Sequence, residues 1–243
     1  MPRIVHLGFG NFHRAHQAWY TQRANAITGS DWRITGVSMT RPDLRDALAA
    51  DGFSYTLAER GAEGLKTSRI TVHDRVLVAA EDPRAVVAEI ADPQTQIVTL
   101  TVTEKGYCLG PDGRLDLNAP AIVEDLRTGA PRTAIGLLAH GLAARAAIGA
   151  PLTVLSCDNL PENGEKTAEA VARFAEAVDT RIAPYLSEKT RFPSSMVDRI
   201  TPATTNAIRA EISALTRKTE PSPVLTEAFS DWVITDDFAT PHP

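Results

Sequence analysis

The stretch RIVHLGFGNFHRAH, residues 3–16, is the part of the sequence that indicates the fold of this chain most clearly. Its first part, Arg3 to Leu7, is a short apolar run that predicts a β-strand, and Gly8 ends it. A helix is expected from about Asn11 to Ile27. A strand, a Gly-x-Gly turn and a helix in this order bring backbone N–H groups and a helix N-terminus toward a pyrophosphate. The stretch therefore predicts a phosphate-binding turn of the dinucleotide-binding kind.

The two glycines of this turn have different expected roles. Gly8 allows the tight turn after the strand, and Gly10 lets phosphate groups approach the backbone. His13 occupies the position at which the fingerprint has a third glycine, so we expect the helix and the strand to pack less closely there. A match of two glycines alone is also compatible with an ordinary strand–helix turn.

The rest of the chain alternates short β-rich runs with longer helical ones, which predicts βαβ units and a parallel sheet. The polar stretch 53–80 carries β-like pieces at 55–57, 69–72 and 76–78, and we interpret it as a small β insertion or edge hairpins. We therefore predict one α/β domain over residues 1–243, with a Rossmann-type, doubly wound, mostly parallel sheet. Further strands are expected at 32–38, 95–103 and 152–156, and helices from 42, from 83, and at 134–148, 167–182 and 204–218.

Composition narrows the class of protein. The chain has 243 residues, which is long enough to bury a real core, and its net charge of −5 argues against a nucleic-acid partner. The two cysteines, Cys108 and Cys157, form no CxxC pattern and predict free thiols in a reducing compartment. We find no apolar run long enough for a membrane span and no room for a signal peptide before the first strand. These features predict a cytoplasmic protein with no membrane partner.

The end of the second predicted strand bears on coenzyme choice. An acid at this position hydrogen-bonds the ribose of NAD, whereas an arginine accommodates the additional phosphate of NADP. The sequence here is SMTRPD, so Asp43 is the first carboxylate and Arg41 precedes it. We expect NAD as the coenzyme, with NADP left open.

Five separated segments together resemble the mannitol dehydrogenase family of polyol and sugar-acid oxidoreductases. They run in the family's order along the whole chain: GFGNFHRAH at 8–16, TVTEKGY at 101–107, SCDNLPENG at 156–164, FPSSMVDRITP at 192–202 and WVITDDF at 232–238. The resemblance implies a Rossmann-type N-terminal domain followed by a mostly helical C-terminal domain, and we expect no counterpart of the second domain in this chain. It also implies metal-independent hydride transfer between NAD(P) and a polyol or aldonate.

The resemblance assigns two supporting catalytic residues to this chain. Asn159 is similar to a family asparagine that helps to bind the substrate oxygen, and Asp198 is similar to an aspartate that lines the substrate cleft. In the family, the general base is a lysine in a K-x4-N-x2-H motif of the C-terminal domain. None of the five lysines of this chain is followed by that pattern. An isolated chain is therefore expected to be inactive.

Most of these residues also have a structural interpretation. Asn159 is a good helix cap, and Asp198 is placed to pair with Arg199. Arg14 would contact the cofactor or lie in solvent, and Lys105 would contact the cofactor, serve a structural role, or be mistaken for the general base. His13 and His16 have a spacing that suits a metal, but we expect them to pack locally and predict no metal site. The predicted cofactor-binding residues are Gly8, Phe9, Gly10, Asn11, Phe12, Arg14, Asp43, Thr103, Glu104 and Lys105.

The resemblance thus implies an oxidoreductase that acts on mannitol and fructose or on mannonate and fructuronate. The alternative is a catalytically silent nucleotide-binding fragment or subunit that needs a separate C-terminal catalytic domain.

Overall fold

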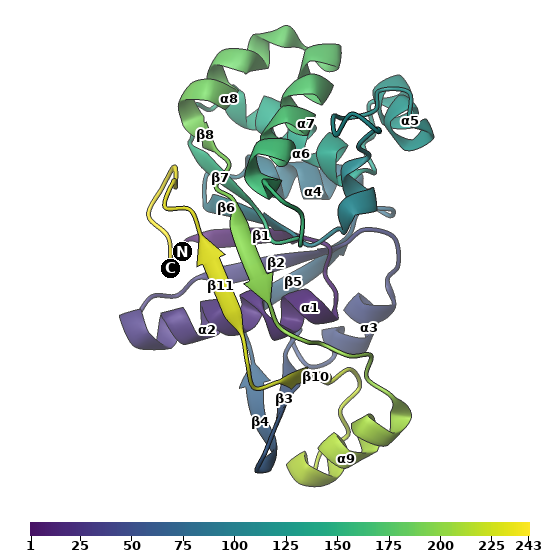
Figure 1. Ribbon diagram of the computed structural model, residues 1–243, viewed down its shortest axis with the longest axis vertical. Coiled ribbons are helices and arrows are strands. Elements are labelled where there is room, and N and C mark those ends of the chain that lie inside the picture. The colour runs from purple at the N-terminus through teal and green to yellow at the C-terminus, as the bar shows by residue number, and fades with distance from the viewer.

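A six-stranded parallel sheet forms the centre of the molecule (Figure 1). The structure is a computed structural model that describes residues 1–243, apart from the side chain of residue 180. The strand order is β5-β2-β1-β6-β7-β8. From β1 the sheet is extended toward one edge by β2 and β5 and toward the other edge by β6, β7 and β8, so the order of addition reverses between β1 and β6. This arrangement confirms the predicted doubly wound, Rossmann-type sheet. The strands are β1 (Arg3–Leu7), β2 (Arg33–Ser38), β5 (His73–Val78), β6 (Thr95–Leu100), β7 (Leu152–Ser156) and β8 (Thr190–Arg191).

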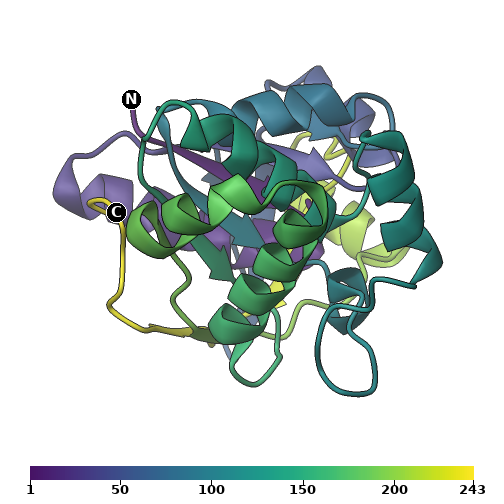
Figure 2. The same cartoon turned by 90° about the horizontal axis from the view of Figure 1, so that it is seen from above.

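Successive side chains of the central strands point to opposite faces of the sheet and contribute to two hydrophobic cores, one on each face. Val5 and Leu7 belong to one core, and Ile4 belongs to the other. The first core is covered by α4 (Pro83–Ala91), α6 (Ala134–Ala146) and α7 (Asn163–Val178). The second lies under α1 (Asn11–Ala15), α2 (Gln17–Thr28) and α3 (Asp43–Ala49). Figure 1 shows these two groups of helices on opposite sides of the sheet, and in Figure 2 the first group lies over it.

The helix after the glycine turn is broken, which corrects the predicted continuous helix from 11 to 27. The break falls at His16, whose backbone angles of φ −114° and ψ −85° are not helical. The His16 ring explains the break, since its Nε2 donates to the carbonyl of Asp231 at 2.8 Å and the ring packs edge-on against Trp232. These partners lie more than 200 residues away, so local propensity does not predict the break.

The stretch 53–80 divides between two sheets. Strands β3 (Tyr55–Gly61) and β4 (Gly64–Ile70) form an antiparallel hairpin, and β10 (Val224–Glu227) joins it in a three-stranded sheet. Strand β5, however, pairs with β2 at the edge of the main sheet, so the predicted insertion is wrong for residues 73–78. An edge strand has only one neighbour, and β5 carries the charged residues Asp74 and Arg75, which is why it resembles an insertion in sequence.

The remaining elements surround this frame. The helix predicted from 167 begins earlier, at Asn163, and the one predicted at 204–218 is α9 (Asn206–Thr216), whose first turn is capped by Thr205. A two-stranded antiparallel ribbon joins β9 (Ser195–Asp198) to β11 (Asp231–Ile234). The other elements are η1 (Glu104–Tyr107), α5 (Pro120–Thr128), η2 (Thr180–Ile182) and α8 (Ala183–Lys189). Among the described residues, no helix has the length and apolar character needed to cross a membrane.

Candidate coenzyme and substrate site

The two glycines of the turn after β1 differ in what surrounds them. Gly8 has φ +101°, and a Cβ built on it would lie 2.0 Å from the carbonyl oxygen of Thr101, so the fold itself excludes a side chain there. A Cβ on Gly10 would meet only the carbonyl oxygen of Gly8, at 3.6 Å. The protein therefore leaves open space at Gly10, as expected if a ligand approaches the backbone at this point.

Two adjoining cavities lie at the carboxyl ends of β1, β6 and β7, where the strand order reverses. They share Gly8, Thr101 and Thr103. The first, of about 430 Å³, is lined by Gly8, Gly10, Asn11, Phe12, Thr101, Thr103, Cys157, Asp158, Asn159, Val197, Asp198 and Arg199. The second, of about 370 Å³, is lined by Gly8, Phe9, Met39, Thr101, Val102, Thr103, Gly106, Cys108, Arg132, Thr133 and Ala134. Ligands of open α/β sheets bind at this reversal point.

The structure brings most of the predicted site residues together. The first cavity joins the glycine turn to Thr103, Asn159 and Asp198, which come from the ends of β6, β7 and β9. Phe9 lines the second cavity, and its ring packs on Gly36 so closely that a Cβ there would lie 2.6 Å away. Glu104 and Lys105 lie in the exposed turn η1 and are not among the residues that line either cavity. Their role as cofactor contacts stays a prediction.

Arg14 does not lie in solvent, so that alternative is wrong. Its side chain is 1% exposed and its guanidinium packs over the ring of Tyr55. It donates to the carbonyl of Ser222 at 2.7 Å and to Oδ1 of Asn11 at 2.6 Å. Burial lowers its pKa to about 10. These contacts orient Asn11 at the cavity wall, and the direct cofactor contact of Arg14 stays a prediction.

The structural interpretations of Asn159 and Asp198 also fail. The residue that caps α7 is Glu162, not Asn159. Arg199 is bound to Glu59 and to the carbonyls of Ala15 and Glu227, and Asp198 is not among its partners in the described part of the chain. Asn159 and Asp198 are both exposed at the cavity. Their side chains are therefore accessible to a ligand.

His13 packs against the sheet in the place of the third glycine. Its ring stacks on His6 of β1 with the ring centroids 3.5 Å apart, and its Nε2 lies 3.0 Å from Nε2 of His73. Two stacked rings thus lie between the helix and the strand at this point. The looser packing expected there stays a prediction. Burial lowers the pKa of His6 and of His73 to about 3, and it also lowers that of His13.

Sequence reasoning missed three buried residues at the first cavity or beside it, Asp158, Asn163 and Tyr107. Asp158 accepts hydrogen bonds from the backbone N–H groups of Val102 and Thr103 and from the hydroxyl of Tyr107. Asn163 donates to the carbonyls of Asp158 and Ser195, which ties the loop after β7 to β9. Burial and the carboxylate of Asp158 raise the pKa of Tyr107. Two of these residues lie in the segment SCDNLPENG, but their partners outside that segment are 32 to 56 residues away in sequence.

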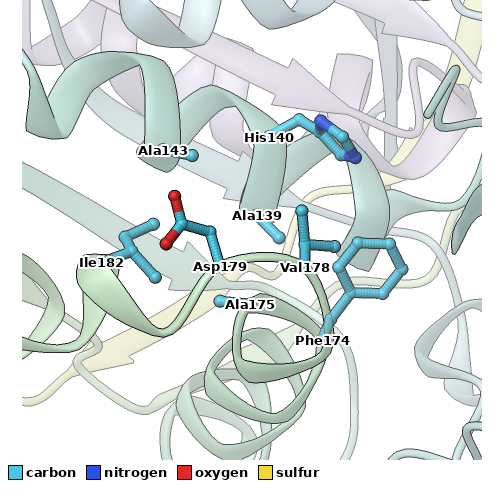
Figure 3. A pocket seen from close by; sticks show the side chains of 8 residues that line it. All are labelled: Ala139, His140, Ala143, Phe174, Ala175, Val178, Asp179 and Ile182. Atoms are coloured by element: carbon cyan, nitrogen blue, oxygen red, sulfur yellow. The ribbon is translucent and has the colours of Figure 1, made fainter.

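A further cavity lies between α6 and α7, where His140 and Asp179 face a wall of apolar side chains (Figure 3). Its volume is about 20 Å³, which is close to the space of one water molecule. None of the predicted site residues lines it, and it is too small for a substrate.

An open parallel sheet, a Gly-x-Gly turn at the reversal of strand order and cavities at the strand ends define a Rossmann-type dinucleotide-binding domain. Comparison with known proteins agrees, since the mannitol dehydrogenase Rossmann domain matches residues 2–243. The chain belongs to the mannitol dehydrogenase family, as the five segments predicted.

Two curated relatives and one solved structure are similar over the whole chain. The D-mannonate oxidoreductase of Escherichia coli (strain K12) is 41% identical over 99% of this chain and 51% of its own length. The mannitol 2-dehydrogenase of Cereibacter sphaeroides is 41% identical over 100% and 52%. A ternary complex of Pseudomonas fluorescens mannitol 2-dehydrogenase with NAD and D-mannitol superposes with a TM-score of 0.93 at 37% identity, over 100% of this chain and 51% of that one. The chain thus spans about half the length of the relatives it matches.

Proposed function

We propose that this chain binds NAD across the two adjoining cavities, as the coenzyme domain of an oxidoreductase acting on a polyol or a sugar acid. The observation that carries the proposal is the open space at Gly10 beside the tight turn at Gly8. The cavities fit a dinucleotide, since they share the glycine turn and extend from it to Met39 on one side and to Asn159 on the other.

Different residues of the chain would contact different parts of NAD. The backbone N–H groups after Gly10, in the first turn of α1, would face the pyrophosphate, because the first N–H groups of a helix have no partner within it. Asn11 lies at the same wall and is oriented by Arg14. The nicotinamide ring, when bound, accepts or donates the hydride.

The substrate would lie beside Asn159 and Asp198. The amide of Asn159 can donate a hydrogen bond to the substrate oxygen on which negative charge develops, and such a donor contributes roughly 3 kcal/mol to catalysis when preorganised. The carboxylate of Asp198 can accept a hydrogen bond from a substrate hydroxyl. Mannitol and mannonate are the substrates to test first, because the names of the relatives indicate these two compounds.

The proposal is tested by the substitution Gly10→Val. Its branched side chain would enter the space proposed for the phosphates, so we expect at least a tenfold loss of NAD affinity, about 1.4 kcal/mol. Because a Cβ at Gly10 meets no close neighbour, the variant should keep its fold. Titration calorimetry with NAD measures the affinity, and thermal unfolding monitors the fold.

Gly61→Val is the matched control. Gly61 lies in the hairpin of β3 and β4, and its Cβ would meet only the Cβ of Ala228, at 3.9 Å. This variant should bind NAD as the unmodified chain does. Equal affinity of the Gly10→Val variant and the unmodified chain, or no binding by the unmodified chain, would contradict the proposal.

A further inference from the structure

Thr103, at the boundary of the two cavities, has a strained backbone. Its angles are φ 65° and ψ 163°. This conformation is almost confined to glycine, and a β-branched residue with positive φ is a genuine outlier. Cys108, Glu162 and Arg217 also have positive φ, but their ψ angles of 30° to 39° place them in the more accessible left-handed helical region. Strain of this kind persists only where surrounding contacts enforce it.

The contacts that enforce the conformation come from Asp158. One carboxylate oxygen accepts from the N–H of Val102 at 3.0 Å, and the other accepts from the N–H of Thr103 at 2.8 Å. The hydroxyl of Tyr107, a fully buried residue, donates to the first oxygen at 2.8 Å. Asp158 is itself 9% exposed. A carboxylate with three donors in a buried setting is fixed in one orientation, and it fixes the turn that it binds.

The position of the turn matters because Thr103 lines both cavities. Asp158 follows β7 and precedes Asn159, while Thr103 follows β6. The carboxylate therefore couples the loop that bears Asn159 to the turn at the cavity boundary. A relaxed Thr103 would rotate the peptide groups on either side of it and change the shape of both cavities.

We propose that Asp158 is a positioning residue, which holds the strained turn at Thr103 in the shape that admits the dinucleotide. This inference rests on the proposed function, since it assigns to Asp158 a part in the same binding site. It predicts that NAD affinity no longer depends on Asp158 when residue 103 is a glycine, because glycine adopts φ 65° without strain.

The test is a double-mutant cycle with NAD binding as the readout. Asp158→Asn replaces one acceptor by a donor that faces a backbone N–H, and we expect it to lower NAD affinity at least tenfold. Thr103 lines both cavities, so the affinity of Thr103→Gly alone is measured as the reference for the double variant. The double variant should bind within threefold of Thr103→Gly. If Asp158 had only a general structural role, a more flexible residue at position 103 would not restore NAD affinity. Rescue of NAD affinity by glycine therefore indicates a positioning role.

Asp82→Asn is the matched control, because Asp82 also accepts a backbone N–H, that of Ala85, but does so at the start of α4. It should leave NAD affinity unchanged. If Asp158→Asn does not fold, Tyr107→Phe removes only one of the three bonds and should lower the affinity at least threefold, again with rescue by Thr103→Gly.

The results separate the positioning role of Asp158 from the proposed function. Equal affinity of the folded Asp158→Asn variant and the unmodified chain overturns the inference alone, as does a double variant that binds no better than Asp158→Asn. An unaltered affinity in Tyr107→Phe has the same meaning where Asp158→Asn is unfolded. Absence of NAD binding by the unmodified chain overturns the proposed function and this inference together.

Discussion

Asp43 and Arg41 are bonded to each other on the surface just beyond β2. Nε of Arg41 donates to Oδ2 of Asp43 at 2.9 Å, and both side chains are largely exposed, at 79% and 68%. An ion pair of this kind contributes less than about 1 kcal/mol. A bound ribose or phosphate therefore competes with it easily, and either residue is free to contact the coenzyme.

We expect the pair to set coenzyme preference, with NAD bound more tightly than NADP. Asp43→Ala should weaken NAD binding, because the acceptor for the ribose hydroxyls is lost, and Arg41→Ala should weaken NADP binding, because the cation near the additional phosphate is lost. Titrations with each coenzyme measure both effects. Asp179→Ala, which breaks the similar surface pair with Arg181, should change neither. An NADP affinity tenfold above that of NAD would contradict the prediction.

The residues of the site differ in how far sequence could predict them. Gly8 and Gly10 follow a strand and precede a helix, so a local pattern identifies them. Asn159 and Asp198 emerged only from the resemblance of whole segments. The buried position of Arg14 and the bonds of Asp158 could not be predicted, because their partners, Ser222 and Val102 among them, meet these residues only after the chain has folded.

At the scale of elements, β1, α1 and β5 meet in a buried cluster of histidines, His6, His13 and His73. The facing Nε2 atoms of His13 and His73 form a hydrogen bond only if one of them is unprotonated. The buried guanidinium of Arg14 adds a positive charge nearby, which further lowers the pKa of His13 and His73. The folded chain therefore holds these rings neutral below the pH at which they ordinarily take up protons.

This cluster predicts a loss of stability in acid. The unfolded chain binds protons at the ordinary histidine pKa of about 6.5, whereas His6 and His73 in the folded chain have pKa values of about 3. Since the unfolded state binds more protons, the free energy of unfolding should be greatest above pH 6.5 and fall as the pH decreases toward 3. Urea unfolding at several pH values measures this slope.

His73→Phe should make the slope shallower, because one of the titrating rings is gone, although the variant is less stable at neutral pH through the lost bond to His13. His242→Phe is the control, since His242 is exposed near the end of the chain and should leave the slope unchanged. A slope that is the same in all three proteins would show that the cluster does not control acid stability.

The predictions of secondary structure are wrong where tertiary contacts override the local preference of the sequence. One helix is predicted over 11–27, but the bond from His16 to Asp231 divides it. Polar residues over 53–80 indicate an insertion, yet β5 is held in the main sheet by its pairing with β2. The central strands were predictable because burial on both faces makes them continuous apolar runs.

At the scale of the whole molecule, the candidate site is assembled from four distant segments. The turn after β1 and the ends of β6 and β7 meet because parallel strands present their carboxyl ends at one edge of the sheet. Strand β9 belongs to the antiparallel ribbon and is tied to the loop after β7 by Asn163. The cavity so formed remains in contact with solvent, since Thr103, Asn159 and Asp198 are all exposed. One side of the site is thus built by this chain, and the opposite side is open.

We therefore predict that the 243-residue chain has no measurable dehydrogenase activity on mannitol, mannonate or their keto partners. Oxidation of a secondary alcohol requires a base for the hydroxyl proton, and losing it reduces the rate by roughly 10²–10⁴. Asn159 offers a donor and Asp198 a carboxylate, but no lysine of the chain has the family's K-x4-N-x2-H pattern. Incomplete positioning of the substrate and access of water to the open cavity reduce the rate further.

The measurement is NADH formation from mannitol or mannonate by the purified chain, with Lys105→Ala as the companion variant. Lys105 is the lysine nearest in sequence to Thr103, and it is exposed in η1. The expected result is no NADH above background from either protein, even where titration shows that NAD is bound. Steady NADH formation by the unmodified chain would contradict the prediction. Its loss in Lys105→Ala, with NAD affinity unchanged, would then identify Lys105 as the base. The exposed ammonium group would in that case reach the substrate hydroxyl from outside the cavity wall.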